Sequence, residues 1–446
     1  MSSTLFGTDG VRGTAGEYPL DRVTVARIGA ALVRAMAAGD RPLRFVTGRD
    51  TRESGGWIEQ ELARGASSAG AAVTSAGMVP TPAVAYVTRT MGFDAGLVIS
   101  ASHNPFGDNG IKVFSGRGEK FTEDLEREVE SIVARGDWIV PPSAEARLDR
   151  IDVLDAYIAH ARLALPEPQR LGAFPIAIDT ANGATAVVAP RLLRELGIAV
   201  HVLNASPDGR NINLECGSTH PAGLAAAVRQ HGCRMGVAFD GDGDRAIFVD
   251  AGGSVVDGDA VLLMCARHLK AQGRLRGNAI VATVMSNIGL ELALRESGIE
   301  LVRCPVGDKY VMEEMIRRGL SLGGEQSGHI IFSDHLYTGD GLATALSVLR
   351  VMADTGRELA DLAAELVSYP QVLVNVRVRE KKDLKSVPEI AETIDAVEKR
   401  LSGQGRLLVR YSGTEPLLRV MLEGRDQREI QKWAAEIAGA VNAHLG

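Results

Sequence analysis

The sequence predicts an α/β protein of four domains. Three similar α/β units with mixed, mainly parallel sheets precede a smaller C-terminal α+β domain. The first observation is length, because 446 residues exceed the roughly 250–300 that one hydrophobic core supports. The second is a pattern of strands and helices that occurs three times, and the third is a change of pattern near residue 370. We therefore expect domains at residues 1–150, 151–254, 255–368 and 369–446.

The repeated unit starts with a short β-rich segment that ends in a polar loop, followed by an Ala/Leu-rich helical stretch. These first segments are Leu43–Asp50, Pro175–Gly183 and Ala279–Gly289. Second strands are expected at Ala72–Ser75, Ala199–Leu203 and Glu300–Cys304, and third strands at Gly96–Ser100, Met235–Phe239 and Leu320–Gly323. Alternating strands and helices indicate parallel sheets, whose ligands bind at the carboxyl ends of the strands. The polar loops after the third strands are therefore predicted to face a site.

The C-terminal segment has a different pattern. Valines at every second position from Val372 to Val378 indicate a strand with one buried face. A charged helical stretch at about 387–401, strands at 406–410 and 417–423, and a terminal helix follow. This order predicts the small α+β domain.

Composition excludes several classes of protein. A net charge of −7 and a pI near 5.8 argue against nucleic-acid binding. The four cysteines form no CxxC pair, which is typical of reduced thiols in a cytosolic protein. The first residues do not resemble a signal peptide, and no apolar run approaches the roughly 18 residues of a membrane span. We therefore expect a cytoplasmic protein without a membrane or nucleic-acid partner. The common nucleotide-binding motifs are also absent from the sequence.

The sharpest local signal is the acidic loop DGDGDR after the third strand of the second unit. Asp240, Asp242 and Asp244 alternate with glycines that allow a tight turn. Two such charges about 4 Å apart repel by about 4 kcal/mol at an effective dielectric near 20, and a hard divalent cation relieves this repulsion. An EF-hand is excluded, because Arg245 and Ala251 stand where its glycine and glutamate belong. Oxygen-only ligands favour Mg²⁺.

The loops after the other third strands also carry reactive side chains. In SASHNP, either Ser100 or Ser102 could be a nucleophile activated by His103, and the local sequence leaves both open. In GEQSGH, Glu325 and Ser327 could bind sugar hydroxyls or an amine. Each loop could also be an ordinary polar turn.

Further polar loops could bind anions. In RYSGTEP, hydroxyls, backbone amides and guanidinium groups fit a phosphate. TDGVRG and GRDTR are basic loops near the start of the chain. Gly307, Asp308 and Lys309 follow a second strand and could meet a phosphate or a hydroxyl. Taken singly, each of these is also consistent with a structural turn.

Together, TDGVRG, SASHNP, DGDGDR, GEQSGH and RYSGTEP resemble the α-D-phosphohexomutase superfamily, in the family's order and over essentially the whole chain. The motif GGEQSGH, with Gln326, resembles the motif of the branch that acts on glucosamine phosphates. Tyr411 departs from the Pro or Lys that related enzymes often have, which should not alter phosphate contacts. The resemblance implies four domains around a central cleft.

The resemblance also implies roles for individual residues. Ser102 would carry the transferred phosphate, and Asp240, Asp242 and Asp244 would bind Mg²⁺ together with a phosphoserine oxygen. Glu325 and Ser327 would grip sugar hydroxyls, with Gly307, Asp308 and Lys309 also binding substrate. The phosphate that does not react would be held by Arg410, Ser412, Gly413, Thr414 and Arg419, while Arg12, Lys112, Arg245 and His329 would lie near the reacting oxygens.

The implied activity is the interconversion of glucosamine 6-phosphate and glucosamine 1-phosphate. Phosphoserine and glucosamine 1,6-bisphosphate, as intermediate and activator, would carry the phosphate. The product would feed UDP-N-acetylglucosamine and cell-wall precursor synthesis. Lys112 or His329 could be the base, and the chain could form a homodimer. Alternatives are a preference for mannose or glucose phosphates, a phosphatase, and a phosphosugar-binding protein without turnover.

Overall fold

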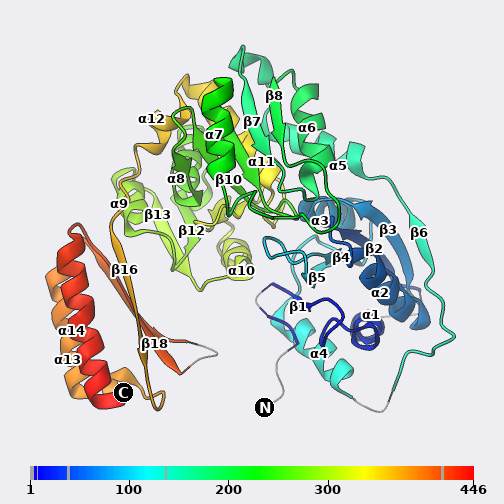
Figure 1. Cartoon of the computed structure of the whole chain (residues 1–446), viewed down its shortest axis with the longest axis horizontal. Helices are drawn as coiled ribbons and strands as arrows, with labels where there is room; N and C mark the ends of the chain where they lie inside the picture. Colours follow the sequence, from blue (N-terminus) through cyan, green and yellow to red (C-terminus); the bar gives the residue numbers. More distant parts are fainter. Residues whose placement is uncertain (1–4, 8, 38–40, 136–137, 413–415) are drawn as a thin grey trace. The chain divides into compact units, whose positions relative to one another are not determined.

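The computed structural model describes residues 5–7, 9–37, 41–135, 138–412 and 416–446. The chain divides into two compact units, one made of Met1–Met285 with Ser297–Glu365 and the other of Ser286–Glu296 with Leu366–Gly446. The first unit holds three mixed sheets with helices beside them, and the second holds a small antiparallel sheet (Figure 1). Within the described residues, no helix is both long enough and apolar enough to cross a bilayer.

The first sheet has six strands in the order β1-β5-β4-β2-β3-β6. Its strands are β1 (Val11–Thr14), β2 (Arg44–Arg49), β3 (Ala72–Met78), β4 (Ala95–Ile99), β5 (Asp108–Ser115) and β6 (Leu148–Arg150). Its helices are α1 (Arg22–Met36), α2 (Gly55–Ser68), α3 (Thr81–Thr90) and α4 (Glu123–Ala134). Helices α1 and α2 cross very closely, because a Cβ at Gly65 would lie 1.8 Å from the Ala26 carbonyl oxygen. Only glycine fits this crossing.

The second sheet has five strands in the order β11-β10-β9-β7-β8. Its strands are β7 (Ile176–Asp179), β8 (Val200–Leu203), β9 (Met235–Phe239), β10 (Ala246–Asp250) and β11 (Val255–Val256). The α-helices in this part are α5 (Leu154–Ala161), α6 (Thr185–Glu195) and α7 (Ala222–His231), and the short helices are η1 (Arg162–Ala164) and η2 (Pro168–Leu171).

The third sheet has four strands in the order β13-β12-β14-β15. They are β12 (Ala279–Thr283), β13 (Glu300–Cys304), β14 (Leu322–Gly324) and β15 (Ile330–Phe332). The helices around them are α8 (Gly258–Ala271), η3 (Arg276–Asn278), α10 (Asp308–Arg318), α11 (Gly341–Thr355) and α12 (Leu359–Ala363).

The three sheets share one arrangement, which confirms the repeat seen in the sequence. In each, the first strand of the repeat lies between the third and the second, in the orders β4-β2-β3, β9-β7-β8 and β14-β12-β13, and all these pairs are parallel. A fourth strand, β5, β10 or β15, then pairs antiparallel with the third. The three predicted loops therefore occupy equivalent positions, between the third and fourth strands of their sheets.

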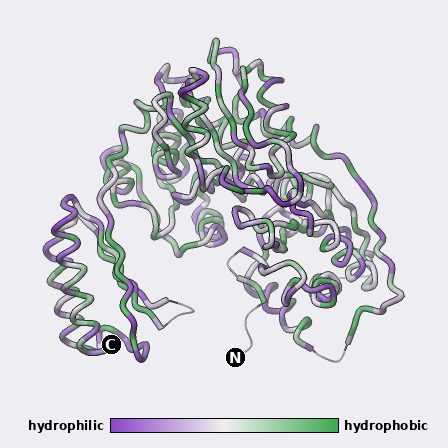
Figure 2. Tube along the Cα trace, in the orientation of Figure 1, coloured by the Kyte–Doolittle hydropathy of each residue, from purple (hydrophilic) through white to green (hydrophobic). Residues whose placement is uncertain are grey.

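The second unit contains an antiparallel sheet in the order β16-β18-β17. Its elements are α9 (Ile288–Glu296), β16 (Gln371–Arg377), η4 (Leu384–Ser386), α13 (Pro388–Leu401), β17 (Arg406–Tyr411), β18 (Leu417–Glu423) and α14 (Gln427–Leu445). As predicted, Val376 is buried and Asn375 exposed on β16. Figure 2 shows hydrophobic residues along these strands and a mixture along α14. The amide of Ile288 donates to the buried Glu423 carboxylate at 3.1 Å, which anchors α9 in this unit.

Candidate functional site

The loop after β4 holds Ser102 in an unusual, fully buried conformation. Ser102 is 1% exposed and has φ of 53°, in the left-handed region that L-residues rarely adopt. Its hydroxyl donates to Oδ2 of Asp240, and its Oγ lies 3.4 Å from Nδ1 of His103. Ser100 points elsewhere, because its hydroxyl donates to Asp50. Of the two candidate serines, Ser102 is therefore the one that faces the acidic loop.

The loop after β9 brings three carboxylates together in the interior. Asp240, Asp242 and Asp244 are 0%, 1% and 3% exposed. Each offers one oxygen such that the three atoms lie within 4.8 Å of one another. Thr81, the first residue of α3, fixes the central carboxylate by donating both its amide, to the Asp242 carbonyl, and its hydroxyl, to Oδ2. The acidic loop is thus assembled by its own glycines and by the N-terminus of α3.

These carboxylates fit a divalent cation. Oδ1 of Asp242 and Oδ1 of Asp244 are buried and have no hydrogen-bond partner among the described residues. Buried polar atoms without a hydrogen-bond partner are costly, so these two carboxylate oxygens point to a ligand. Burial and the two neighbouring carboxylates raise the pKa of Asp240 well above its usual range. A hard cation with oxygen ligands would relieve both penalties.

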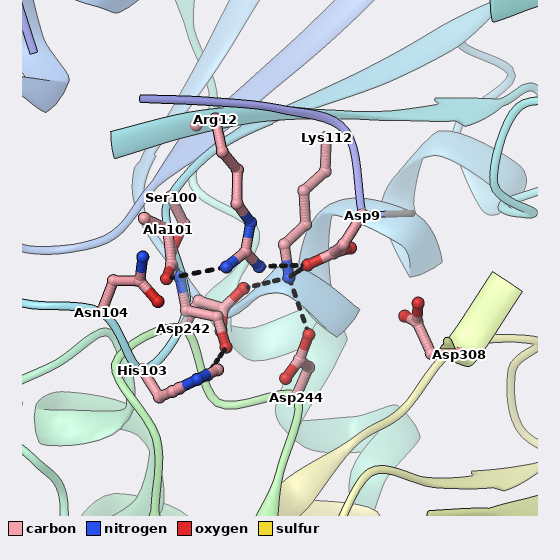
Figure 3. A network of polar contacts seen from close by, with 12 residues as sticks. Asp9, Arg12, Ser100, Ala101, His103, Asn104, Lys112, Asp242, Asp244 and Asp308 are labelled. Carbon is pink, nitrogen blue, oxygen red and sulfur yellow. Dashed lines mark hydrogen bonds and ion pairs between the residues drawn. The ribbon is translucent and has the colours of Figure 1, made fainter. Parts of the chain in front are cut away.

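Lys112 on β5 is the main internal counter-charge of the triad (Figure 3). Its Nζ donates to Oδ2 of Asp242 and of Asp244, both at 2.8 Å, and lies 3.2 Å from Asp9. Burial opposes the charge of Lys112, but these three carboxylates outweigh it and raise the pKa of the ammonium well above its usual value. Lys112 is therefore an ammonium in this arrangement.

Asp9, which the sequence did not single out, organises the cations of the first domain. It forms ion pairs with Arg12, Lys112 and Lys120. Lys120 in turn pairs with Asp308 at the start of α10. This ion pair links a loop beside the first sheet to a loop beside the third. No short motif marks Asp9 and Lys120 as partners, because 111 positions separate them.

The third sheet contributes Glu325 and His329. Glu325 accepts the Gly307 amide at 3.2 Å and lies 3.4 Å from the Ser327 hydroxyl. His329 is 1% exposed and accepts the Gly339 amide on Nε2, while its Nδ1 faces Asp244 at 3.7 Å. Asp308 and Lys309 have different partners. Asp308 pairs with Lys120, whereas Nζ of Lys309 pairs with Glu126 of α4 at 2.5 Å.

A cavity of about 460 Å³ connects these loops. Arg12, His103, Arg245, Asp308, Glu325 and His329 are among the residues that line it. This volume lies in the usual range for a small-molecule site. The cavity therefore collects cationic, acidic and hydrogen-bonding groups from all three sheets of the first unit.

The two histidines of this cavity have opposite electrostatic surroundings. Burial, Arg245 and Arg12 lower the pKa of His103 to about 4. For His329, burial also disfavours the charge, but the Asp308 and Asp244 carboxylates outweigh it and raise the pKa. At neutral pH His103 is a neutral imidazole beside the Ser102 hydroxyl.

The predicted phosphate-binding residues lie in the second unit. Arg410 on β17 is directly opposite Arg419 on β18, so the two guanidinium groups start from one face of the sheet. Ser412 is 4% exposed, and its amide donates to the Leu417 carbonyl. Gly413 and Thr414 lie outside the described residues.

Comparison with known proteins identifies the family. Models of the phosphoglucomutase/phosphomannomutase family match in order: alpha/beta/alpha domain I at residues 3–139, domain II at 155–253, domain III at 257–369 and the C-terminal domain at 373–440. A phosphoglucosamine mutase of Solibacter usitatus is 49% identical over 447 residues, covering 100% of both chains. One of Bdellovibrio bacteriovorus is 47% identical over 450 residues, covering 99% of this chain and 98% of its own.

Solved structures show the same fold. A phosphoglucomutase/phosphomannomutase family protein from Burkholderia thailandensis has a TM-score of 0.80 at 24% identity, covering 99% of this chain and 98% of that one. An Aspergillus fumigatus N-acetylphosphoglucosamine mutase, solved with GlcNAc-6P and magnesium, has a TM-score of 0.67 at 17% identity, covering 98% and 95%. At these identities the likeness concerns the fold alone.

Proposed function

Because the chain belongs to the phosphoglucomutase/phosphomannomutase family, we propose that it interconverts glucosamine 6-phosphate and glucosamine 1-phosphate, with Ser102 carrying the transferred phosphoryl group. The observation that carries this proposal is the buried Ser102 hydroxyl hydrogen-bonded to Asp240 of a three-carboxylate cluster. The full-length relatives described above, which are named phosphoglucosamine mutases, support the choice of sugar.

The reaction moves one phosphoryl group out and another back. Phosphorylated Ser102 gives its group to the O1 hydroxyl of glucosamine 6-phosphate, so the Ser102 Oγ–P bond breaks and an O1–P bond forms. The resulting 1,6-bisphosphate turns around, and Ser102 takes the phosphoryl group from O6. Glucosamine 1-phosphate leaves, and the phosphoserine is restored. The net reaction is an isomerisation that needs no nucleotide.

The residues of the cavity position and neutralise the reacting group. Asp240, Asp242 and Asp244 would hold Mg²⁺, which when bound offsets negative charge on the transferring phosphoryl group. Arg12 and Arg245 line the same cavity and would bind its oxygens. Positioning and charge complementarity supply most of the rate enhancement in such transfers.

The sugar would be held by groups away from the triad. Glu325 and Ser327 would accept and donate hydrogen bonds to its hydroxyls or amine, with Gly307 and Asp308 beside them. Lys309 keeps its predicted substrate role only if its ion pair with Glu126 opens. The phosphate that does not react would be bound by the loop from Arg410 to Arg419, including Ser412, Gly413 and Thr414.

Each transfer also requires a base for the attacking hydroxyl proton. Lys112 and His329 are the two candidates. In the present arrangement Lys112 is an ammonium held by carboxylates, so it could accept a proton only after Asp242 and Asp244 take another partner. His329 has Nδ1 directed toward Asp244, and its Nε2 accepts the Gly339 amide.

The test is a ³¹P NMR time course with Mg²⁺, glucosamine 6-phosphate and a trace of sugar bisphosphate. Growth of a 1-phosphate resonance without free phosphate supports the proposal. Steady release of free phosphate would indicate a phosphatase instead. No change with any hexose phosphate, on enzyme whose intact mass shows a phosphorylated serine, would indicate a binding protein.

Sugar preference needs its own measurement. Relative kcat/KM values on glucosamine, glucose and mannose phosphates rank the three substrates, and we expect glucosamine phosphate to lead. A higher value for mannose or glucose phosphate would move the chain to another branch of the same family. We also place the enzyme in the cytoplasm, where its product would feed UDP-N-acetylglucosamine and cell-wall precursor synthesis. Light scattering would test the homodimer.

A further inference from the structure

The backbone of the Ser102 loop is held from behind by two side chains from different parts of the first unit. Nη2 of Arg52 donates to the carbonyl oxygens of Ser102 and Asn104, at 3.2 and 2.5 Å. Nδ2 of Asn213 donates to the same two carbonyls, at 2.9 and 3.0 Å. Two donors therefore converge on two acceptors on either side of His103.

Both donors are buried and are themselves fixed. The side chain of Arg52 is 0% exposed and forms an ion pair with Asp50, which is also 0% exposed. Asn213 is 8% exposed, and its backbone amide donates to the Ala181 carbonyl at 2.9 Å. Arg52 follows strand β2 of the first sheet, whereas Asn213 lies between β8 and α7, in the part of the chain that forms the second sheet.

Asp50 also reaches the other side of the Ser102 peptide. The Ser100 hydroxyl donates to Asp50, and the Ser102 amide donates to Ser100 Oγ at 2.9 Å. The amide and the carbonyl of Ser102 are therefore both tied to one carboxylate, through Ser100 and through Arg52. A left-handed serine persists only where its surroundings hold it, and these contacts do so.

The acidic loop packs directly on this arrangement. A Cβ on Gly241 would lie 2.6 Å from the Ser102 carbonyl oxygen and 2.8 Å from Nδ2 of Asn213. Only a glycine allows this approach, so the acidic loop packs directly against the Ser102 carbonyl and the Asn213 side chain. Phosphorylation would bring nearly two negative charges toward three carboxylates. Until a cation neutralises these charges, the repulsion favours outward movement of the serine loop, which the contacts from behind oppose.

We propose that Arg52 and Asn213 are positioning residues, which form a carbonyl clamp that fixes Ser102 against the Asp240–Asp244 loop for phosphoryl transfer. The clamp rests on the proposed function, because it matters for catalysis only if Ser102 carries the phosphate. It does not contact the sugar, whose candidate ligands Glu325 and Ser327 come from the third sheet. Its loss should therefore slow transfer and leave substrate binding nearly unchanged.

The main test uses two substitutions of Asn213. Asn213 itself has φ of 58°, so Asn213→Gly removes the donors and keeps an allowed backbone. Asn213→Asp keeps the shape and turns a carboxylate oxygen toward the two carbonyls. Because a misplacement of about 1 Å can cost about 100-fold in rate, we expect kcat to fall about 10-fold in Asn213→Gly and about 100-fold in Asn213→Asp. The KM for glucosamine 6-phosphate should stay within about threefold, as for an interaction made only in the transition state.

A second readout separates positioning from general stability. The single-turnover rate of Ser102 phosphorylation by glucosamine 1,6-bisphosphate, followed by intact mass, should fall in parallel with kcat. Asn278→Gly is the matched control, because Asn278 is exposed, also left-handed with φ of 49°, and lies at the end of η3 in the third domain. It should keep wild-type kcat. Arg52→Lys retains the positive charge beside Asp50 but loses the two-nitrogen guanidinium fork. Its kcat should lie between the values for the wild type and Asn213→Asp.

The outcomes are distinguishable from failure of the proposed function. A wild type that makes no glucosamine 1-phosphate, or a Ser102→Ala variant that still turns over, refutes the function. An active wild type, an inactive Ser102→Ala and a fully active Asn213→Gly refute the clamp alone. A raised KM with unchanged kcat also overturns it. If Asn213→Asp fails to fold, Asn213→Gly and Arg52→Lys decide, and wild-type phosphorylation rates in both refute the clamp.

Discussion

The loops that follow the third strands of the three sheets occupy equivalent positions but differ in how they are held. In the first two, Ser102 and Asp242 are each 1% exposed, and their side chains are hydrogen-bonded across the domain boundary. In the third, Glu325 is half-buried, and Gln326 and Ser327 are exposed. The same turn of the repeat is therefore buried in two domains, where we propose phosphoryl transfer, and more exposed at residues 325–327 of the third, where we propose sugar recognition.

This difference corresponds to the two tasks of a mutase. Phosphoryl transfer needs fixed distances and exclusion of water, which burial supplies. Recognition must accept the sugar in two orientations, because either phosphate can face the serine. An exposed loop with short polar side chains can serve both orientations. The comparison predicts that changes in the buried loops lower kcat, whereas changes in the exposed loop raise KM.

The largest expected effect comes from Ser102→Ala. Removal of the hydroxyl that we propose carries the phosphate should lower kcat at least about 10³-fold, as loss of other covalent nucleophiles does. Circular dichroism should show an unchanged fold, and intact mass should show no phosphorylated form. Ser100→Ala is the control. It loses the hydrogen bond to Asp50 and the one that Ser100 accepts from the Ser102 amide, so kcat should fall, but far less than in Ser102→Ala. Full activity in Ser102→Ala would show that another residue carries the phosphate.

Asp242→Asn is expected to have the next largest effect. The substitution removes one charge from the triad and leaves Lys112 with fewer anionic partners. We expect kcat to fall about 100-fold and the Mg²⁺ concentration for half-maximal rate to rise about 10- to 100-fold. A metal titration of the steady-state rate measures both. Asp155→Asn, whose carboxylate is 83% exposed, should leave the titration unchanged. An unaltered titration in Asp242→Asn would exclude the triad as the metal site.

The exposed loop should respond differently and less strongly. Glu325→Gln replaces a charged acceptor with a neutral one of the same size, and hydrogen bonds to charged groups contribute about 1.5–3 kcal/mol. We expect KM to rise about 10-fold and kcat to fall less than threefold. Ser327→Ala should raise KM about threefold. Initial rates across a range of glucosamine 6-phosphate concentrations separate the two parameters. A collapse of kcat with constant KM would erase the contrast between the loops.

The sequence predicts most of this architecture because the repeat has strong local signals. The strands at 300–304 and 235–239 match β13 and β9, and the acidic loop is recognisable from its spacing. The fourth, antiparallel strands β5, β10 and β15 are not predicted, and β15 contains only three residues, too few for a periodic signal. Local sequence also leaves Ser100 and Ser102 open, and the resemblance to the family favours Ser102. The structure adds the physical reason, namely that only Ser102 faces Asp240.

Contacts between distant segments could not be predicted. Arg52 and Asn213 reach the same carbonyls from positions 50 and 111 residues away from Ser102. Lys309 looks like a phosphate ligand in sequence, but Glu126 of α4 takes its ammonium group. Such pairings depend on how whole domains pack, and no local spacing encodes them.

The smallest expected effect concerns the histidines where the three domains of the first unit meet, away from both kinds of loop. His160 stacks on Tyr86 with ring centroids 4.3 Å apart and meets His335 edge-on at 5.7 Å. Burial, helped by His335 and Arg89, lowers the pKa of His160 to about 4. The unfolded chain, with an ordinary histidine pKa near 6.5, therefore binds more protons between these values. The contribution of His160 to the free energy of unfolding is therefore fully present above about pH 6.5 and is lost as the pH falls toward 4.

His160→Phe tests this prediction, because it keeps a ring against Tyr86 and removes the titrating group. The decrease in Tm between pH 7 and pH 5 should be smaller than in the wild type. The difference corresponds to at most one proton in the pH slope of the free energy of unfolding. His231→Gln, at an exposed histidine stacked on His201, should keep the wild-type slope. Neither variant should change kcat at pH 7.5, since neither residue lines the cavity. An unchanged slope in His160→Phe would assign the acid sensitivity to other groups. A changed slope would separate acid unfolding at the domain junction from the pH dependence of the transfer site.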